Sequence, residues 1–558
     1  MRPLAERVKS GQFVYMTELV ASGLKREAQV LEIASKLAMI PEIAGGSITS
    51  YAGGQLGQDS IRVGTAVRAR GLVPNVHLTC VGQDRQTIDK TLNQLRALEM
   101  HNIFAISGDW PKAAVRTAVF DIDSVQLAAH IAELRAKTGA PFFISCAVSP
   151  FKYQREDCLY QYLKLEKKIA AGAEMAITQV GWDATKFVEL KKYLDERGIK
   201  TPVLGNVYVL SRRAAERMNT GNPPGCWASD ELVAILKKES EAPDGGLQAR
   251  LERGARSIAV LKGIGYAGAY IGGTHDSNHI RWMIKRAEEL APKWEELYEE
   301  LQYGKKDGFY LYKRDPQPKP TRTFLPTVMD AAAKTLPFVP WAKSPKDSPI
   351  KRALAGVFRW IDGHPTLNHW FERFEYYSKK EVFGCQNCGN CVLGSMEYVC
   401  PQTCPKQMRN GPCGGTFHGA CEVIDQQCIW VNVMERAEAS NTINQLKLYI
   451  PPPDRKLTGT ASWVNFYLGR DSRPGRPKDL WKGGSGPGRT VAIDEDERLK
   501  TAGPPAADKA LAARQAKAGP AAGGTSGTGG TSGTSGTSGK SGTSGTSGKV
   551  EEVKSKAS

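Results

Sequence analysis

The chain has 558 residues, too long for one ordinary domain, and about 150 residues per domain suggests three to four units. Hydrophobic residues make up 41% and charged residues 24%, and twelve cysteines in this length exclude a small disulfide-stapled scaffold. The formal net charge of +17 leaves nucleic acid, an anionic ligand or a basic tail open as its cause.

Short apolar or β-branched runs recur through the first 290 residues. They predict eight strands, at 13–19, 41–49, 75–80, 102–109, 141–148, 174–181, 201–209 and 268–273. Helical periodicity is clearest in the intervening segments 26–40, 84–100 and 124–139. Strands that alternate with helices form parallel βαβ units, so we predict an α/β fold, a (β/α)₈ TIM barrel over residues 1–295. A doubly wound Rossmann sheet is the alternative, although no GxGxxG motif follows the first strand.

The remainder of the chain changes composition three times. Residues 296–364 include a Pro/Lys-rich stretch and are predicted to be a connector. Residues 365–440 hold eight of the twelve cysteines and are predicted to be a small metal-binding domain. Residues 441–558 lead into Gly/Ser/Thr repeats, which cannot bury enough apolar area to fold, so we expect a disordered tail. From residue 453 onward, 17 Lys/Arg and 10 Asp/Glu contribute +7 of the net charge.

Polar residues gather where the predicted barrel strands end, which is where barrel enzymes carry their active sites. Glu18 ends the first strand, His77 lies in the third, Asp109 ends the fourth and Gln179 ends the sixth. A buried carboxylate is costly unless it has a partner or a chemical role. The alternative is that Glu18 and Asp109 pair with Lys or Arg, or cap the following helices.

The cysteine spacing predicts a metal site. The eight thiols suffice for two four-thiolate sites and stand at Cys385, Cys388, Cys391, Cys400, Cys404, Cys413, Cys421 and Cys428. The CxxCxxC run with later Cys-Pro steps is closer to a [4Fe–4S] pattern than to a zinc ribbon. Zinc and disulfides remain the alternatives.

Several ordered motifs resemble methylenetetrahydrofolate reductase. In segment 74–111 an HLTC strand leads through a helix to a strand that ends in Gly-Asp, and KKIAAGAEMAITQ (167–179) is the most specific element. The similarity covers about residues 10–290. The family reduces 5,10-methylenetetrahydrofolate to 5-methyltetrahydrofolate through a bound flavin in one-carbon metabolism. The resemblance therefore implies an oxidoreductase with a folate substrate and FAD or FMN.

The resemblance also implies roles for individual residues. Glu18 matches the glutamate that assists opening of the methylene bridge, Asp109 matches an aspartate near flavin and pterin, and Gln179 matches a folate-contacting glutamine. The implied flavin contacts are Thr49, His77, Gly108, Asp109, Ala147 and Lys168, of which Lys168 is a candidate phosphate partner.

Three departures from the family pattern concern the flavin tail and the strand ends. Ser107 replaces an arginine, Leu19-Val20-Ala21 replaces a Pro-Pro pair, and Thr49 and Ser50 are both compatible with the same position. These departures leave the choice between FAD and FMN open. Two other functions also stay open: a folate-binding methyltransferase with a corrinoid partner, and an electron-transfer subunit with a vestigial barrel. The joint presence of Glu18, Asp109 and Gln179 argues against the second.

Residues from about 365 to 435 resemble the Cys-rich domain of anaerobe-type methylenetetrahydrofolate reductases, which implies electron transfer to the flavin. The donor is then NAD(P)H at the flavin, or an electron-transfer protein such as ferredoxin at the module. With no nucleic-acid module, no apolar run long enough for a membrane helix and no secretory signal, we expect a cytoplasmic protein that binds neither nucleic acid nor membrane. A homo-oligomer is also considered.

Overall fold

The computed structural model describes residues 3–21, 24–50, 58–111, 118–313, 321, 323–336, 338–342 and 348–474. All of the described residues belong to one compact unit. The repeats predicted to be a disordered tail lie outside the described residues.

Eight parallel strands close a barrel in chain order, which confirms the predicted TIM barrel and shows that the Rossmann alternative is wrong. The strands are β1 (Val14–Leu19), β2 (Ile43–Ile48), β3 (Pro74–Thr79), β4 (Asn102–Ile106), β5 (Phe143–Val148), β6 (Met175–Thr178), β7 (Val203–Tyr208) and β8 (Gly268–Gly272). β8 pairs with β1 in parallel, and Val14 lies opposite Gly268. β4 and β6 end earlier than predicted, so Asp109 and Gln179 lie in the segments that follow these strands.

Helices surround the strands, as alternating βαβ units require. They are α2 (Leu24–Leu37), α3 (Ser60–Arg68), α4 (Arg85–Ala97), α5 (Ser124–Thr138), α6 (Arg155–Ala170), α7 (Ala184–Glu196), α8 (Arg212–Asn219), α9 (Asp230–Glu239), α10 (Leu247–Ile264) and α11 (Ser277–Leu290). Five helices begin after an aspartate whose side chain accepts a hydrogen bond from the first turn: Asp59, Asp84, Asp123, Asp183 and Asp276. These caps fix where each helix starts relative to the strand before it.

The inside of the barrel is apolar at the amino ends of the strands. Helix α1 (Pro3–Lys9) inserts Leu4, Ala5 and Val8 into a cluster with interior side chains such as Met16 and Phe143. Because α1 closes this end, a ligand site must lie at the carboxyl ends, where barrel enzymes place it.

The C-terminal module is mainly helical. After η2 (Ala291–Lys293) and α12 (Trp294–Glu300), it contains α13 (Phe324–Thr335), α14 (Pro349–Asp362), α15 (Pro365–Phe383), η3 (Leu393–Met396), η4 (Pro401–Thr403), α16 (Ile429–Ala439), η5 (Ile443–Lys447), η6 (Arg455–Leu457) and α17 (Ser462–Tyr467). Phe358 of α14 stacks on Tyr467 of α17 at 4.3 Å between ring centroids. The folded part therefore extends to residue 474, beyond the predicted start of the tail at 441, because the apolar residues of α17 are buried.

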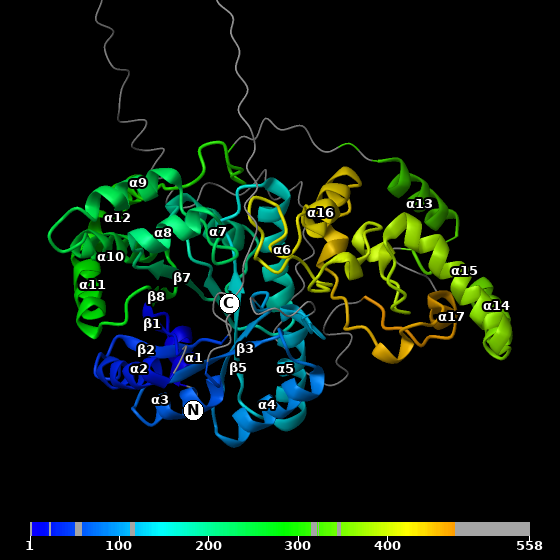
Figure 1. Cartoon of the computed structure of the whole chain (residues 1–558), viewed down its shortest axis with the longest axis horizontal. Coiled ribbons are helices and arrows are strands. Elements are labelled where there is room, and N and C mark those ends of the chain that lie inside the picture. The colour runs from blue at the N-terminus through cyan, green and yellow to red at the C-terminus, as the bar shows by residue number, and fades with distance from the viewer. Residues whose placement is uncertain are drawn as a thin grey trace, which may run out of the picture. The chain divides into compact units, whose positions relative to one another are not determined.

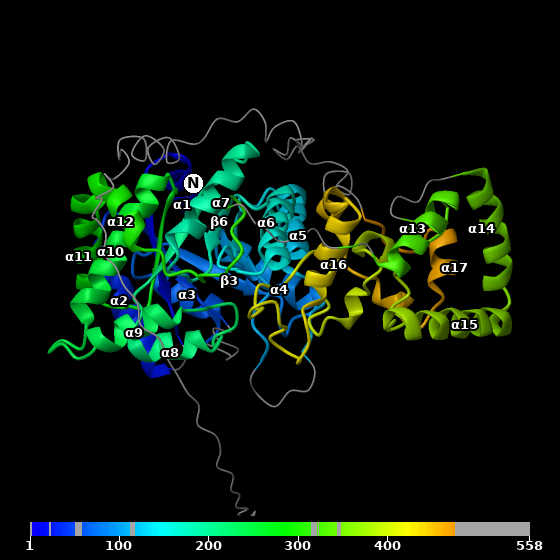
Figure 2. The same cartoon turned by 90° about the horizontal axis from the view of Figure 1, so that it is seen from above.

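The module packs on the barrel through α6 and the start of α5. Helix α16 lies beside α6 in both views (Figures 1 and 2), and Tyr160 meets Trp430 edge to face at 4.9 Å. Asp123, the cap of α5, also accepts hydrogen bonds from the backbone N–H of Arg409 and of Asn410, at 3.2 and 3.0 Å. α5 and α6 are consequently buried on two sides, against the sheet and against the module.

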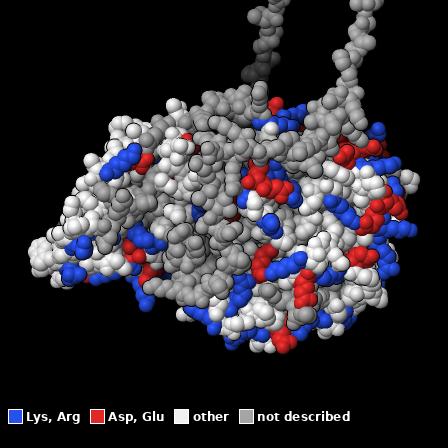
Figure 3. Space-filling view, turned by 180° about the vertical axis from the view of Figure 1, so that it is seen from behind, with Lys and Arg blue, Asp and Glu red and all other residues white. Residues whose placement is uncertain are grey.

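The described surface carries both signs of charge. On the face drawn in Figure 3, Lys and Arg are interspersed with Asp and Glu. None of the described helices has the length and apolar character that crossing a membrane requires.

Candidate active site

A cavity of about 530 Å³ opens at the carboxyl ends of the strands. All eight site residues predicted in the barrel line it: Glu18, Thr49, His77, Gly108, Asp109, Ala147, Lys168 and Gln179. This volume lies within the range of small-molecule and cofactor pockets, roughly 300–1,000 Å³. The barrel therefore brings these residues to one site although 161 positions separate Glu18 from Gln179.

Glu18 is a carboxyl group held away from bulk water. Burial raises the pKa of Glu18 from 4.5 to about 7. Its carboxylate lies against Gly272 of β8, where an added Cβ would be 3.1 Å from Oε2. Among the described residues no Lys or Arg side chain pairs with Glu18. Within this part of the chain, the alternative that Glu18 forms an ion pair is therefore not supported. A carboxyl with this pKa can donate a proton near neutral pH.

His77 is buried and uncharged at neutral pH. Burial lowers the pKa of His77 to about 3. Its Nε2 shares a hydrogen bond with Ser47 Oγ at 3.0 Å, and its ring meets Phe104 edge to face at 4.8 Å. Asn75 Nδ2 donates to the same Ser47 Oγ at 3.1 Å. These buried polar residues hold the imidazole in one orientation at the cavity wall.

Lys168 and Ala147 lie together on the β5 side of the cavity. Lys168 Nζ donates to the Ala147 carbonyl at 2.6 Å, and burial lowers the pKa of Lys168 to about 8. On the neighbouring side, Gln179 Oε1 accepts from the Val180 N–H at 2.9 Å. Thr49 Oγ1 donates to the Leu19 carbonyl at 3.3 Å. Backbone contacts thus orient all three polar side chains.

Gly108 follows β4 in a conformation that favours glycine. Its φ is +85°, and a Cβ added there would lie 2.5 Å from Val81 Cγ1. The neighbouring Asp109 is partly exposed at the cavity and interacts electrostatically with Lys406 of the C-terminal module. Asp109 therefore has a cationic neighbour, as the ion-pair alternative expects. That neighbour is Lys406, which the sequence pattern did not indicate.

The C-terminal module forms a second wall of the same cavity. Its lining residues are Lys406, Pro412, Cys413, Gly414, Gly415 and Glu422. None of them was predicted to be at this site, and Cys413 was predicted only as a metal ligand of the Cys-rich domain. The only sequence signal was their position among the cysteines, which pointed to a metal-binding loop and not to the barrel.

Two buried barrel lysines hold this loop in place. Lys164 Nζ donates to the carbonyls of Gly411 and Pro412 at 3.1 and 2.7 Å. Lys152 Nζ donates to the Thr416 carbonyl at 2.5 Å, and Thr416 Oγ1 donates to Asp157 Oδ2 at 2.5 Å. The segment that carries Cys413 is thus fixed at the cavity on both sides of the cysteine.

The eight clustered cysteines fall into two sets. In the first set, Cys385, Cys388, Cys391 and Cys400 line a separate small cavity of about 30 Å³ in the module. In the second set, Cys404 interacts electrostatically with Cys421, and Cys413 with Cys404, while Cys428 interacts with both Cys413 and Cys404. Only the second set reaches the barrel cavity, through Cys413.

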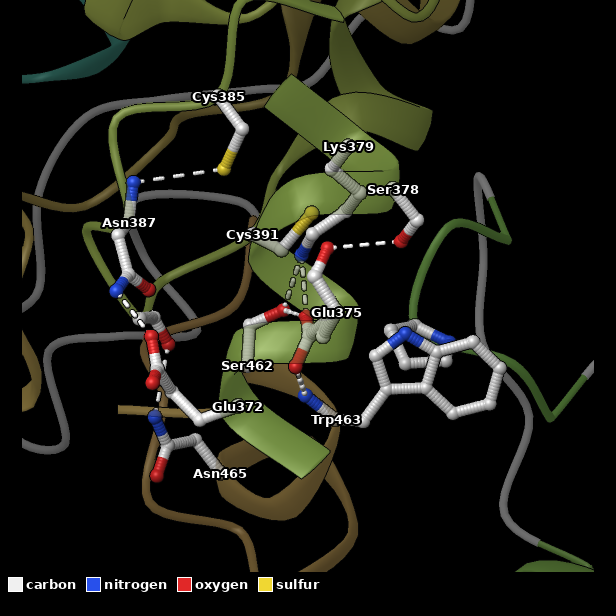
Figure 4. Close-up of polar contacts among 12 residues, drawn as sticks. Glu372, Glu375, Ser378, Lys379, Cys385, Asn387, Cys391, Ser462, Trp463 and Asn465 are labelled. Carbon is white, nitrogen blue, oxygen red and sulfur yellow. Dashed lines mark hydrogen bonds and ion pairs between the residues drawn. The ribbon is translucent and has the colours of Figure 1, made fainter. Parts of the chain in front are cut away.

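Charged and polar side chains lie near two cysteines of the first set, Cys385 and Cys391 (Figure 4). Lys379 of α15 lies beside Cys391, forms an ion pair with Glu375 and donates to Ser462 Oγ at 2.8 Å. The Asn387 N–H donates to Cys385 Sγ at 3.4 Å. Within the described residues, however, no group of three or more His, Cys, Asp or Glu side chains has an arrangement that could hold a metal ion.

Two family models and several curated proteins are similar to parts of this chain. Residues 4–221 match the family described as Methylenetetrahydrofolate reductase, and residues 364–456 match Methylene-tetrahydrofolate reductase C terminal. A probable methylenetetrahydrofolate reductase (NADPH) of Caenorhabditis elegans is 28% identical over 138 residues, 25% of this chain and 20% of that protein. The 5,10-methylenetetrahydrofolate reductase of Salmonella typhimurium is 25% identical over 142 residues, 25% of this chain and 45% of that protein.

The similarity to solved structures is weaker. One such structure is described as an uncharacterized protein from Clostridium thermocellum that binds two copies of 5-methyl-5,6,7,8-tetrahydrofolic acid, with 15% identity and a TM-score of 0.37, over 52% of this chain and 99% of that one. The chain spans less than half of the length of the curated relatives it matches. The two family matches together nevertheless cover more than half of the chain. The barrel, over residues 4–221, and the module, over residues 364–456, therefore each match methylenetetrahydrofolate reductases.

Proposed function

We propose that the chain reduces 5,10-methylenetetrahydrofolate to 5-methyltetrahydrofolate with a bound flavin. One observation carries the proposal: the candidate acid Glu18, the candidate folate contacts Asp109 and Gln179, and the candidate flavin contacts line a single cavity. The family match supports the same reaction.

The described residues fit a flavin. Neutral His77 can share a hydrogen bond with the ring system, Gly108 presents backbone without a side chain, and the cationic Lys168 suits an anionic part of the cofactor. A bound flavin would supply the hydride that reduces the folate. FAD is the form that we propose, and FMN is the alternative that the departures from the family pattern leave open.

Glu18 would act on the folate as a general acid. In the product the carbon stays on N5, so the bond from the methylene carbon to N10 breaks and N10 takes a proton. With a pKa of about 7, the Glu18 carboxyl is protonated in a useful fraction of molecules at neutral pH. The Asp109 carboxylate would stabilise the cationic iminium that remains on N5. The Gln179 amide offers both a donor and an acceptor to the pterin.

The cysteine module would supply electrons to this site. We propose two four-thiolate metal sites, one for each cysteine set, and [4Fe–4S] clusters as their contents. In a cluster each thiolate binds a different iron, and the CxxCxxC run with later Cys-Pro steps supports a cluster over one zinc ion. The four thiols of the first set line one small cavity. The donor would be NAD(P)H at the flavin or an electron-transfer protein such as ferredoxin at the module.

Anaerobic purification of the full chain provides the test. We expect flavin absorbance with a broad iron–sulfur contribution, iron and sulfide by analysis, and reduction of 5,10-methylenetetrahydrofolate by dithionite-reduced enzyme. Parallel assays with NADH, NADPH and reduced ferredoxin identify the donor. A colourless protein that binds folate and transfers its methyl group to a corrinoid would contradict the proposal and support a methyltransferase.

A further inference from the structure

A buried ion pair from the C-terminal module meets the end of strand β4. Lys406 is 2% exposed, forms an ion pair with Glu422, and donates from Nζ to the Gly108 carbonyl at 3.0 Å. Both side chains line the barrel cavity. Lys406 also interacts electrostatically with Asp109. The module therefore contacts the barrel strand end that carries a predicted catalytic carboxylate.

This pair is one of several contacts that hold the module on the barrel. Other contacts do this at a distance from the cavity: Arg155 pairs with Glu438 at 3.0 Å, and Tyr160 packs on Trp430. Removing a Lys and a Glu from water is expensive, and an apolar pair of similar size is often equally stabilising. A buried ion pair at the cavity thus calls for an explanation other than stability.

Glu422 links Lys406 to the second cysteine set. As a thiol, Cys413 donates from Sγ to Glu422 Oε1 at 3.3 Å; as a metal-bound thiolate it would keep this proximity without the hydrogen bond. A Cβ added at Gly415 would collide with the Glu422 carboxylate. The chain of contacts thus runs from Cys413 through Glu422 and Lys406 to the carbonyl of Gly108. The Lys406 and Glu422 side chains are nearly inaccessible to solvent and Cys413 is half-buried, so the geometry at Gly108 depends on the module.

We propose that Lys406 and Glu422 are positioning residues that set the Gly108–Asp109 segment for the folate reaction. The active site is then a composite of barrel and module, and the barrel alone holds an incomplete site. This inference rests on the proposed function, because its readout is folate reduction. Lys406 acts through Gly108 and Asp109 and takes no part in the proton or hydride transfer.

The test compares two buried Lys–Glu pairs in the full chain. The double variant Lys406→Met/Glu422→Gln removes both charges at the cavity. The matched control Lys186→Met/Glu189→Gln removes a pair in α7 that is equally buried. Like Lys406, Lys186 donates to a main-chain carbonyl, that of Phe309 at 2.8 Å. Neither control residue lines the cavity. The single variant Lys406→Met leaves Glu422 beside Cys413. For each protein, folate kcat and KM, the rate of flavin reduction by dithionite, and the thermal midpoint are measured.

We expect both Lys406 variants to lose about tenfold or more in kcat for folate, the size of one misplaced catalytic group. Flavin reduction by dithionite should stay within twofold of wild type. The control pair should keep wild-type kcat even where its thermal midpoint falls. Wild-type kcat in both Lys406 variants, or an equal loss in the control pair, would overturn the inference. Lack of folate reduction by the wild-type chain would instead overturn the proposed function itself.

Discussion

The barrel wall and the module wall of the cavity are built in different ways. On the barrel side, residues such as Glu18 and Ala147 lie in or just after strands whose ladders fix the backbone. On the module side, residues 411–416 contain no helix or strand and are held by the buried side chains of Lys152 and Lys164. The comparison indicates that residues on the strands can perform the chemistry while residues of the module loop orient them. It also predicts that the two walls respond differently to substitution.

Replacement of Glu18 should give the largest effect, because it removes the proposed acid from the rigid wall. We expect Glu18→Gln to lower folate reduction by about 10²–10⁴-fold, the usual contribution of a general acid. Flavin reduction should be nearly unchanged, since the glutamine occupies the same space. Single-turnover rates for each half-reaction provide the measurement. An equal loss in both half-reactions would show that Glu18 holds the flavin and does not protonate the folate.

The pH dependence of the folate half-reaction should report the ionisation of Glu18. The pKa of Glu18 is raised to about 7, so the protonated acid is lost as pH rises through that value. The folate half-reaction should be flat below pH 7 and fall about tenfold per unit above it. Pre-reduced enzyme mixed with folate between pH 6 and 9 gives the profile. Glu18→Gln should have no such fall, and a wild-type rate that rises through pH 7 would contradict the assignment.

The two cysteine sets provide a test of the module wall. Cys391→Ser affects the set that lies away from the barrel, and Cys413→Ser the set that reaches the cavity. If each set holds one metal site, each variant should lose about half of the bound metal, because one thiolate in four is removed. Only Cys413→Ser should also weaken flavin binding, by about threefold, since Cys413 lines the cavity.

The buried Cys80→Ser is the control and should keep full metal content, because Cys80 belongs to neither set. Metal analysis and flavin titration of the three variants decide the point. If Cys391→Ser abolished all bound metal, the division into two independent sites would be wrong. Full metal content in both set variants would exclude any metal role for these cysteines.

The sequence predicted the barrel wall well because strands and the residues that end them leave a local pattern. Glu18, Asp109 and Gln179 each follow an apolar run, and the barrel topology then brings them together. The module wall leaves no such pattern. Lys406 and Gly108 are 298 positions apart, and only the packing of one domain on another joins them. A weak signal did exist, since α5 is apolar around most of its circumference, which indicates a helix covered on both sides.

Gly108→Ala should give the smallest kinetic effect and tests the point where the two walls meet. Gly108 has a φ of +85°, and a new Cβ would lie 2.5 Å from Val81 Cγ1. Gly198 has a φ of +63° with nothing within 4 Å of the added Cβ, so Gly198→Ala isolates the backbone cost, about 1–2 kcal/mol. We expect Gly108→Ala to lower the free energy of unfolding by roughly 1–3 kcal/mol more, because the clash is added to the strain.

Urea unfolding of the two variants measures that difference, and the folate KM shows whether the site moves with the backbone. Relief of the clash shifts Gly108, and its carbonyl is the atom that accepts from Lys406. A rise of a fewfold in KM for Gly108→Ala alone would therefore show that the strand end and the module loop move together. Equal destabilisation with an unchanged KM would mean that Asp109 keeps its place without this carbonyl, and the strand end would then be set by the barrel wall alone.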